Sequence, residues 1–341
     1  MESTLLAEEL QSTVIQAPIY ITALPRSGTT ILAEFLSHHP HTAHHCYADF
    51  PNIYTPYWNR WRNKHNPFKA KKTERSHGDR ILVNQDSIEA FEEVLWMQHF
   101  SDLHGQGISH QLPSQIPEEF VNNYCNHIKK LLLFNDTSRY LSKANYNINR
   151  LKLITELFPD ARFVVPVRHP VNHLASLMKQ HERFTQAGLK NSKIDKQLAS
   201  SGHFEFGQLR EVVDMGDSVA NKKIQSYWNH GDELNGWAHY WDMFYTTLFQ
   251  LKKTTELGTH MLFVRYEDLC CDSNATLENV LQHCQLNSSI FSEHRAQYTE
   301  KLSLPNYYTI PFDQKQIDTI MEVTEHTAAC FGYDANNYFQ E

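Results

Sequence analysis

The chain has 341 residues, of which 41% are hydrophobic and 21% are charged, and this balance indicates a folded protein rather than a disordered, collagen-like or repeat protein. The formal net charge of −8 argues against a protein whose main task is to coat nucleic acid, because that task needs a basic surface. The length allows one α/β domain with long insertions.

The first predicted unit is a strand, a turn-rich loop and a helix. Residues 19–23 are apolar and β-branched, which is typical of a buried strand. The loop after them contains Pro25 and Gly28, and a helix is expected from Thr29 to about His38. Backbone N–H groups of such a loop converge with a helix N-terminus, where the helix dipole favours anions. This unit therefore predicts a phosphate-binding loop.

Further strands alternate with helices along the chain. An amphipathic helix at 148–157 precedes a strand at 162–165, and Pro170 suits the first turn of the next helix. A strand at 261–264 is followed by a helix around 276–284. The alternation predicts a P-loop-like, three-layer α/β fold with a central, mostly parallel sheet and ligands at the carboxyl ends of its strands.

Two stretches do not fit the sheet pattern. Residues 50–134 are aromatic and helix-leaning, most regularly at 89–96, and are expected to form a helical cap insertion. Residues 179–235 have weak periodicity and are expected to form a mobile helical insertion over the site. We expect residues 1–341 to form one domain that carries both insertions.

The loop at residues 23–30 is not a Walker phosphate loop. Ala23 replaces the first Gly of GxxxxGK[ST] and Thr29 replaces its Lys, so the tight turn and the cation for the β- and γ-phosphates are both missing. Arg26 offers a cation from another point in the loop. A P-loop nucleotide-binding, kinase-like enzyme remains the alternative function.

The loop resembles one in the sulfotransferases that use 3′-phosphoadenosine 5′-phosphosulfate (PAPS). The family's 5′-phosphosulfate loop typically reads Pro-Arg or Pro-Lys-Ser-Gly-Thr-Thr, and this chain has Pro25, Arg26, Ser27, Gly28, Thr29 and Thr30. A second family element is a strand that ends in Arg, with a Ser eight residues later on the next helix. Arg168 and Ser176 have that spacing. The resemblance implies that the loop binds the 5′-phosphosulfate and that Arg168 and Ser176 bind the 3′-phosphate.

The resemblance also bears on the branch of the family. The cytosolic sulfotransferases carry an Arg-Lys-Gly run near the C-terminus that holds the 3′-phosphate, and this sequence has none. The tyrosylprotein-like and bacterial branches are therefore the nearer match. Lys301 or Arg295 is a candidate to replace the missing run.

Catalysis needs cations at the departing phosphate and a base at the attacking hydroxyl. Arg26 is one predicted cation, and the resemblance implies the same role for Lys143. For the general base we expect His45, with Asp49 as its orienting partner or as the alternative base. The reserve candidates are Glu92, Glu93 and His77.

Two other interpretations remain open for the segment after the first helix. His41 and His45 have the i, i+4 spacing of metal ligands on a helix, but Pro40 interrupts that helix and no HExxH motif is present, so we expect no metal. Several aromatic residues farther on either line an apolar acceptor pocket or form the core of the cap: Phe50, Tyr54, Tyr57, Trp58 and Trp61.

The predicted function is transfer of a sulfonyl group from PAPS to a hydroxyl or amine of a small-molecule, lipid, sugar or peptide acceptor. A catalytically inactive nucleotide-binding module is the second alternative. Six cysteines without CxxC spacing favour free thiols, and the sequence shows neither a secretory signal nor a membrane span. We therefore expect a cytoplasmic enzyme with no nucleic-acid partner.

Overall fold

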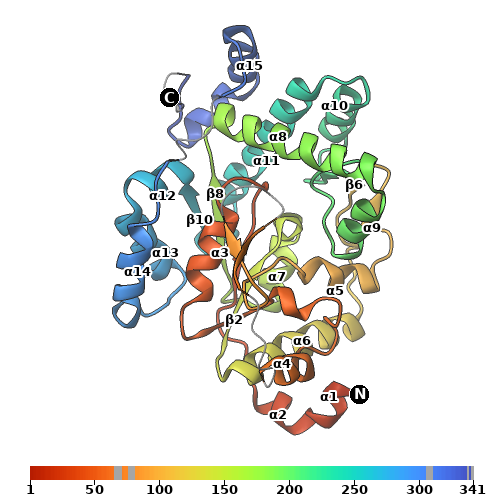
Figure 1. Ribbon diagram of the computed structural model, residues 1–341, viewed down its shortest axis with the longest axis vertical. Helices are drawn as coiled ribbons and strands as arrows, with labels where there is room; N and C mark the ends of the chain where they lie inside the picture. Colours follow the sequence, from red (N-terminus) through yellow and green to blue (C-terminus); the bar gives the residue numbers. More distant parts are fainter. Residues whose placement is uncertain (65–70, 76–80, 305–309, 336–337, 339–341) are drawn as a thin grey trace.

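The computed structural model describes residues 1–64, 71–75, 81–304, 310–335 and 338. Its central sheet has five parallel strands in the order β10-β8-β1-β7-β2, with helices on both sides (Figure 1). In that order the strands are Met261–Arg265, Arg162–Val167, Ile19–Ile21, Arg139–Lys143 and Thr42–His44. This architecture confirms the predicted α/β fold with a central, mostly parallel sheet.

Side chains alternate between the two faces of the sheet and so create two cores. Ile19 and Ile21 of β1 belong to a cluster with side chains of α3 and α13. Tyr20 belongs to a larger cluster with side chains of α6, α8, α11 and α15. Full burial of one such apolar side chain stabilises the fold by about 1.5–3 kcal/mol. The helices of both cores are α3 (Thr29–Ser37), α6 (Glu118–Asn135), α8 (Pro170–Lys190), α11 (Glu233–Thr254), α13 (Ser273–His283) and α15 (Gln314–Cys330).

The histidine-rich segment is extended rather than helical. Thr42–His44 forms β2 because it pairs in parallel with the first residues of β7, and a short 3-10 turn, η1 (Tyr47–Asp49), follows it. His41 and His45 therefore do not share a helix face. The spacing that suggested a pair of metal ligands has no structural basis.

The stretch at 50–134 contains more than helices. It includes α4 (Pro56–Lys64), the β3–β4 hairpin (Thr73–Glu74 and Leu82–Val83), α5 (Glu92–His99), and α6. Helix α5 begins at Glu92, three residues later than the predicted helix at 89–96. Residues 89–91 are therefore not helical, and Glu89 lies in this segment.

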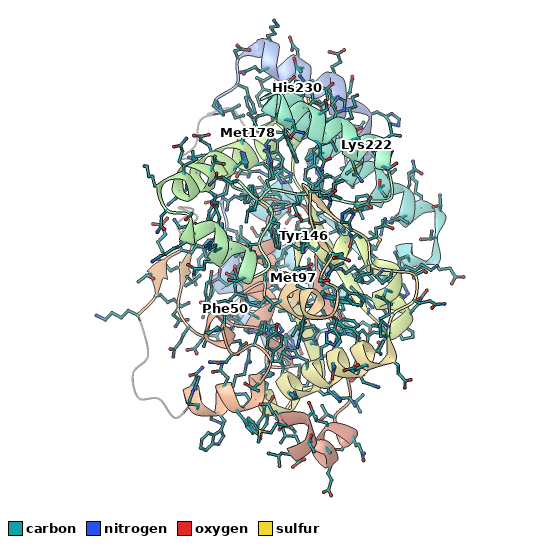
Figure 2. All side chains as sticks on the ribbon, turned by 90° about the vertical axis from the view of Figure 1, so that its right-hand side faces the viewer. Phe50, Met97, Tyr146, Met178, Lys222 and His230 are labelled. Carbon is teal, nitrogen blue, oxygen red and sulfur yellow. The ribbon has the colours of Figure 1, made fainter. Side chains whose placement is uncertain are left out.

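The stretch at 179–235 contains the end of α8 and then α9 (Lys193–Ser200), β9 (Val212–Val213) and α10 (Ser218–Asn229). Strand β9 pairs with β6 (Ile108–Ser109), which also pairs with β5 (His104–Gly105). This small sheet joins the two inserted stretches. In the view of Figure 2, Tyr146 and Met97 lie near the middle and Phe50 lies to their left.

The remaining elements are short and lie mostly at the periphery. Among the helices that the structure describes, none is both long enough and apolar enough to cross a membrane. The remaining elements are α1 (Glu2–Leu5), α2 (Ala7–Ser12), η2 (Asn145–Asn149), α7 (Leu151–Leu157), η3 (Glu256–His260), α12 (Tyr266–Cys271), η4 (Ser289–Phe291) and α14 (Ser292–Thr299).

Candidate active site

A cavity of about 800 Å³ lies at the carboxyl ends of the parallel strands. The loop after β1 lines it, together with Lys143 at the end of β7, Arg168 just after β8 and Tyr266 just after β10. Side chains from both inserted stretches complete its walls. Ligands of open α/β sheets bind at this edge, so the cavity is the candidate active site.

The loop between β1 and α3 has a backbone that depends on glycine. Arg26 and Gly28 both have positive φ, 68° and 108° respectively. A Cβ on Gly28 would meet Tyr266 Cδ2 at 3.0 Å, so a larger residue would have a strained backbone and would have to displace the Tyr266 ring by a few tenths of an ångström. The Ser27 hydroxyl donates to the Leu24 carbonyl at 2.7 Å and closes the turn. The loop thus delivers the N-terminus of α3 to the cavity.

The two predicted donor-binding motifs meet beside this loop. Arg26 Nε donates to Ser176 Oγ at 3.1 Å, and Arg168 Nη1 lies 3.5 Å from the Arg26 carbonyl oxygen. Ser176 lies on α8, which begins after β8, so the strand end and the helix approach the loop together. The motifs are far apart in the chain, yet they form one basic corner of the cavity.

Tyr266 is a cavity residue that sequence reasoning treated as structural. The Arg168 guanidinium lies 4.6 Å from the centre of the Tyr266 ring, which is within cation–π distance. Arg168 Nε is buried and has no hydrogen-bond partner among the described residues. A buried donor without an acceptor suits an anionic ligand. The signal for Tyr266 was its place directly after a predicted parallel strand.

Lys143 forms a charge pair on the other side of the loop. It ends β7 opposite Ile21 of β1, and its Nζ lies 3.5 Å from Glu89 Oε1. Burial alone would raise the pKa of Glu89, but the charges of Lys143 and His203 and a hydrogen bond from Tyr47 hold that pKa well below its ordinary value. Glu89 is therefore an ionised carboxylate inside the cavity.

Glu89 reaches the cavity through backbone pairing that the sequence did not reveal. Cys46 and Ile88 form an antiparallel bridge, and the Glu89 N–H donates to the His45 carbonyl at 3.0 Å. The segment before α5 therefore runs along the segment after β2. A helix starting at residue 89 would not have allowed this pairing.

A second charge pair, His203 and Glu205, lines the same cavity. His203 Nδ1 lies 3.5 Å from Glu205 Oε2, and Asn145 Nδ2 donates to Glu205 Oε1 at 2.8 Å. Burial would lower the pKa of His203, but the hydrogen bond and charge of Glu205 raise it above its ordinary value. No sequence motif singled out either residue.

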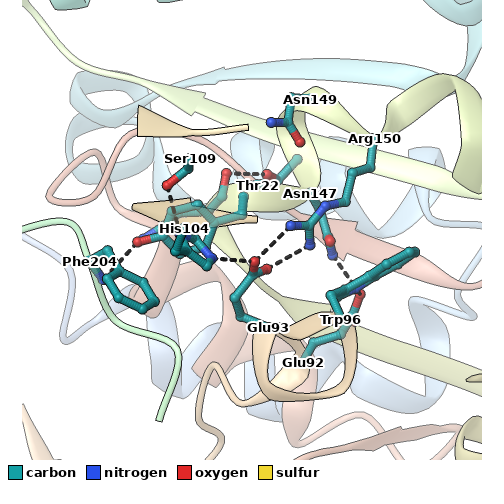
Figure 3. A network of polar contacts seen from close by, with 12 residues as sticks. Thr22, Glu92, Glu93, Trp96, His104, Ser109, Asn147, Asn149, Arg150 and Phe204 are labelled. Atoms are coloured by element: carbon teal, nitrogen blue, oxygen red, sulfur yellow. Dashed lines mark hydrogen bonds and ion pairs between the residues drawn. The ribbon is translucent and has the colours of Figure 1, made fainter. Parts of the chain in front are cut away.

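A buried polar network supports the segment that carries this pair (Figure 3). Glu93 accepts from Arg150 at 2.6 and 2.7 Å and contacts His104 Nε2 at 2.7 Å. The His104 ring stacks on Phe204 with centroids 4.0 Å apart. Gly202 has φ of 78°, and a Cβ there would meet Glu93 Cβ at 2.7 Å. Glu93, a reserve candidate for the base, lies outside the cavity lining and acts through these contacts.

His45 and Asp49 contact each other but not the cavity. His45 Nδ1 lies 3.6 Å from Asp49 Oδ2, and the His45 ring stacks on His127 with centroids 5.0 Å apart. Asp49 accepts from Arg60 Nε and Nη2 at 3.1 and 2.6 Å and from the Cys46 N–H at 2.8 Å. Neither side chain is among the cavity-lining residues, so the pair that we expected at the acceptor instead links β2, η1 and α4.

Glu92 is buried below the cavity. Its carboxylate accepts four hydrogen bonds, from Trp96 at 3.2 Å and from three donors at 2.8 Å: Tyr124, Tyr140 and Asn147. Both of its carboxylate oxygens are engaged within the core, and it does not line the cavity. His77, the last reserve candidate, lies outside the described residues.

Of the five aromatic residues named from the sequence, Phe50 lines the cavity. Tyr54, Trp58 and Trp61 are exposed at 45%, 37% and 58%, so they are neither core nor pocket. Tyr57 packs edge-on against Phe134 with centroids 5.8 Å apart. The acceptor pocket predicted from aromatic content therefore shares only one residue with the observed cavity.

A further arginine approaches the N-terminus of α3. Arg75, next to β3, is 9% exposed, lines the cavity and donates from Nη1 to Thr30 Oγ1 at 3.2 Å. The two residues suggested as replacements for the missing Arg-Lys-Gly run do not line the cavity, and Arg295 pairs with Glu278 instead. Among the described residues no group of three or more His, Cys, Asp or Glu side chains is placed to hold a metal ion.

The comparisons with known proteins agree with the motifs. The model of the sulfotransferase family matches residues 18–223, which is more than half of the chain. The solved sulfotransferase STF9 from Mycobacterium avium is 10% identical, with a TM-score of 0.55 over 98% of this chain and 82% of that chain, which supports the fold. STF1 from Mycobacterium tuberculosis H37Rv is 16% identical, with a TM-score of 0.49 over 97% and 81% of the two chains. A search of curated proteins finds no match. Because the family model matches more than half of the chain, including the loop at residues 23–30, this chain belongs to the sulfotransferase family.

Proposed function

We propose that the chain transfers a sulfonyl group from PAPS to a hydroxyl or amine of an acceptor. The observation that carries the proposal is that Arg26, Arg168 and Lys143 line one cavity around the loop after β1, with Ser176 bound to Arg26 next to the lining. The family membership gives the reaction class, and the placement of the cations supports the donor. We further propose that residues 1–341 act as one catalytic domain.

The proposed donor site has one set of anion-binding groups for each end of the donor. The backbone N–H groups of residues 27–30 and the Arg26 guanidinium would bind the 5′-phosphosulfate. Arg168 and Ser176 would bind the 3′-phosphate. Tyr266 packs on the Arg168 guanidinium and thereby orients it. Arg75 would add a third arginine beside Thr30, supplied by the β3–β4 hairpin.

The proposed chemistry is an in-line displacement at sulfur. A bond forms between the acceptor oxygen and sulfur, and the bond from sulfur to the bridging phosphate oxygen breaks. Arg26 and Lys143 would stabilise the negative charge on the departing phosphate. Glu89, 3.5 Å from Lys143, would accept the proton of the acceptor. We propose Glu89 in place of His45 because Glu89 lines the cavity and His45 does not.

Lys143 links the two halves of this chemistry. Burial alone would raise the pKa of Glu89, but the charge of Lys143 helps to hold that pKa below its ordinary value. Lys143 would therefore stabilise the departing phosphate while it stays beside the base, and Glu89 would act as a weak base.

Two alternatives give different binding results. A kinase-like enzyme would prefer ATP, and an inactive module would bind the nucleotide without consuming PAPS. Calorimetric titration with adenosine 3′,5′-bisphosphate, adenosine 5′-monophosphate and ATP separates the donor classes. Measurement of PAPS consumption with a panel of hydroxyl and amine acceptors then separates enzyme from binding module. Tighter binding of ATP than of the bisphosphate would contradict the proposal.

We also propose a reducing, cytoplasmic compartment for the protein. All six of its cysteines are free thiols in the structure, and Cys46, Cys270 and Cys284 are buried. Resistance of the folded protein to loss of activity under strongly reducing conditions is the expected result.

A further inference from the structure

The order of strands divides the cavity into a donor half and an acceptor half, provided that the proposed function holds. Arg168 and Tyr266 follow β8 and β10 on one side of β1, whereas Lys143 ends β7 on the other side. A donor held by the loop and Arg168 extends over β8 and β10. The acceptor then occupies the half above β7 and β2.

Aromatic rings line the cavity, and Phe206 follows Glu205, which accepts a hydrogen bond from Asn145 just after β7. Phe50 and Phe91 stack with centroids 5.5 Å apart and an angle of 24° between their planes. Phe184 and Phe206 stack with centroids 6.2 Å apart and an angle of 6°. All four side chains line the cavity. Flat apolar surfaces of this kind bind planar rings through stacked and edge-on contacts.

One face of α9 lines the cavity, and Leu198 on that face also packs against the edge of the large core. Ile194, Gln197 and Leu198 line the cavity at the i, i+3, i+4 spacing of a single helix face. None of the residues of α9 is fully buried. An apolar helix face normally packs against a protein neighbour. Here this face also borders the cavity, so an apolar acceptor in the cavity would pack against α9.

The charges in the acceptor half are already balanced. Glu89 pairs with Lys143 and Glu205 pairs with His203, each at 3.5 Å. A charged acceptor would have to separate one of these pairs or enter without a counter-charge, and both are costly in a partly buried site. Arg183, which also lines the cavity, is exposed to solvent. The wall therefore favours an uncharged acceptor.

The base beside the acceptor is a weak one. The pKa of Glu89 lies below its ordinary value because of the nearby cations, so the carboxylate removes a proton most readily from an acidic hydroxyl. The pKa of a phenolic hydroxyl is about 10, whereas the pKa of bulk water is about 15.7. An aryl hydroxyl thus matches the base better than an aliphatic one.

We propose that the acceptor is an uncharged aryl alcohol, held with its ring among the four phenylalanines and its hydroxyl toward Lys143 and Glu89. The phenolic oxygen forms the new bond to sulfur, the bond from sulfur to the bridging phosphate oxygen breaks, and the phenolic proton passes to Glu89. Adenosine 3′,5′-bisphosphate leaves with the electron pair of the broken bond. The α9 face and the phenylalanines select the acceptor by shape and polarity.

The test compares acceptors of matched size with the full chain and PAPS. We would measure kcat/KM for 4-propylphenol, 4-propylcyclohexanol and 3-(4-hydroxyphenyl)propanoate. The phenol should exceed both the saturated alcohol and the carboxylate by about tenfold or more. Titration of each compound into the protein loaded with the bisphosphate should rank the carboxylate last. Equal or better use of the cyclohexanol or the carboxylate would overturn the proposal.

Variants separate this inference from the proposed function. Leu198→Ala and Phe206→Ala should raise KM for 4-propylphenol by roughly fivefold or more while the bisphosphate binds as in the parent. Lys196→Ala, at an exposed position of α9, is the matched control and should change neither value. If the parent does not bind the bisphosphate, the proposed function fails. If it binds the bisphosphate but shows no preference for the phenol, only the acceptor inference fails.

Discussion

Arg26 donates a hydrogen bond to Ser176 at 3.1 Å, across 150 residues of chain. The contact joins the loop after β1 to the helix after β8, and the Arg168 guanidinium lies beside the same loop. Three groups that favour anions thus converge where two parallel strands end. In the proposed function, a bound donor replaces their contacts with one another by contacts to its phosphates. Donor binding and turnover should therefore respond to each of these residues in a different way.

Arg26→Ala should reduce turnover by ~10²-fold or more, because the side chain would stabilise charge on the departing phosphate. Turnover with PAPS and an accepted hydroxyl compound is the measurement, and thermal unfolding checks that the variant is folded. Arg26→Lys, which keeps the charge but loses the planar fork, should be intermediate. Parental turnover in a folded Arg26→Ala protein would rule out this role.

Arg168→Ala should raise the dissociation constant for adenosine 3′,5′-bisphosphate by about tenfold or more, because a hydrogen bond to a charged group contributes roughly 1.5–3 kcal/mol. Ser176→Ala should have a smaller effect in the same direction. Adenosine 5′-monophosphate, which lacks the 3′-phosphate, is the matched control ligand and should bind these variants as it binds the parent. An equal loss of affinity for both ligands would show that Arg168 contacts a part of the donor other than the 3′-phosphate.

Glu89→Gln should reduce turnover by ~10²-fold or more while the bisphosphate still binds, as expected of a general base. The substitution keeps the shape of the side chain and removes its ability to take a proton. His45→Ala and Glu93→Gln are the matched comparisons, because both residues lie outside the cavity lining. If His45→Ala lost more turnover than Glu89→Gln at equal stability, His45 in the segment after β2 would be the base instead of Glu89.

Asp49→Asn should lower stability by about 3–5 kcal/mol near neutral pH, because it leaves the buried Arg60 without its counter-charge. Burial alone would raise the pKa of Asp49, but the neighbouring His45 ring and the charge and hydrogen bonds of Arg60 hold it well below the ordinary range. A depressed pKa contributes stability that is present above the unfolded pKa, about 3.9, and is lost as the pH falls below it. Urea unfolding at pH 7 and pH 3 should therefore differ less for Asp49→Asn than for the parent. An unchanged pH dependence would contradict this account of Asp49.

Arg75→Ala should weaken binding of the bisphosphate by about threefold to tenfold, because the arginine adds a charge beside Thr30 at the phosphate-binding helix. Arg62→Ala is the matched control, since Arg62 is exposed on α4 and bonds to Asn59 within that helix. Equal affinities of Arg75→Ala and Arg62→Ala would show that Arg75 only secures the hairpin.

The sheet and the basic corner were predictable from local patterns. The alternation of strands and helices predicted the sheet and the edge where ligands bind, and the resemblance to the sulfotransferases supplied Lys143, Arg168 and Ser176. The rule for that edge also applies to Tyr266, which follows the strand expected at 261–264, but no motif marked that residue as part of the site.

The acceptor side was less predictable because long-range pairing positions its residues. Glu89 looked like the first residue of a helix, and only the bridge between Cys46 and Ile88 brings it to Lys143. His203 and Glu205 lie in a segment without periodicity, held by contacts from α5 and β5. His45 looked accessible beside the phosphate-binding helix, but strand β2 directs the chain into the core at that point. No spacing rule in a single sequence reports such contacts.

Binding of adenosine 3′,5′-bisphosphate to the parent and to Arg168→Ala, compared with adenosine 5′-monophosphate and ATP, tests the donor site most directly. The account predicts that the parent binds the bisphosphate most tightly of the three ligands. It also predicts that Arg168→Ala loses this preference while its affinity for the monophosphate stays unchanged. A parent that binds ATP more tightly, or an Arg168→Ala protein that keeps full affinity for the bisphosphate, would contradict it.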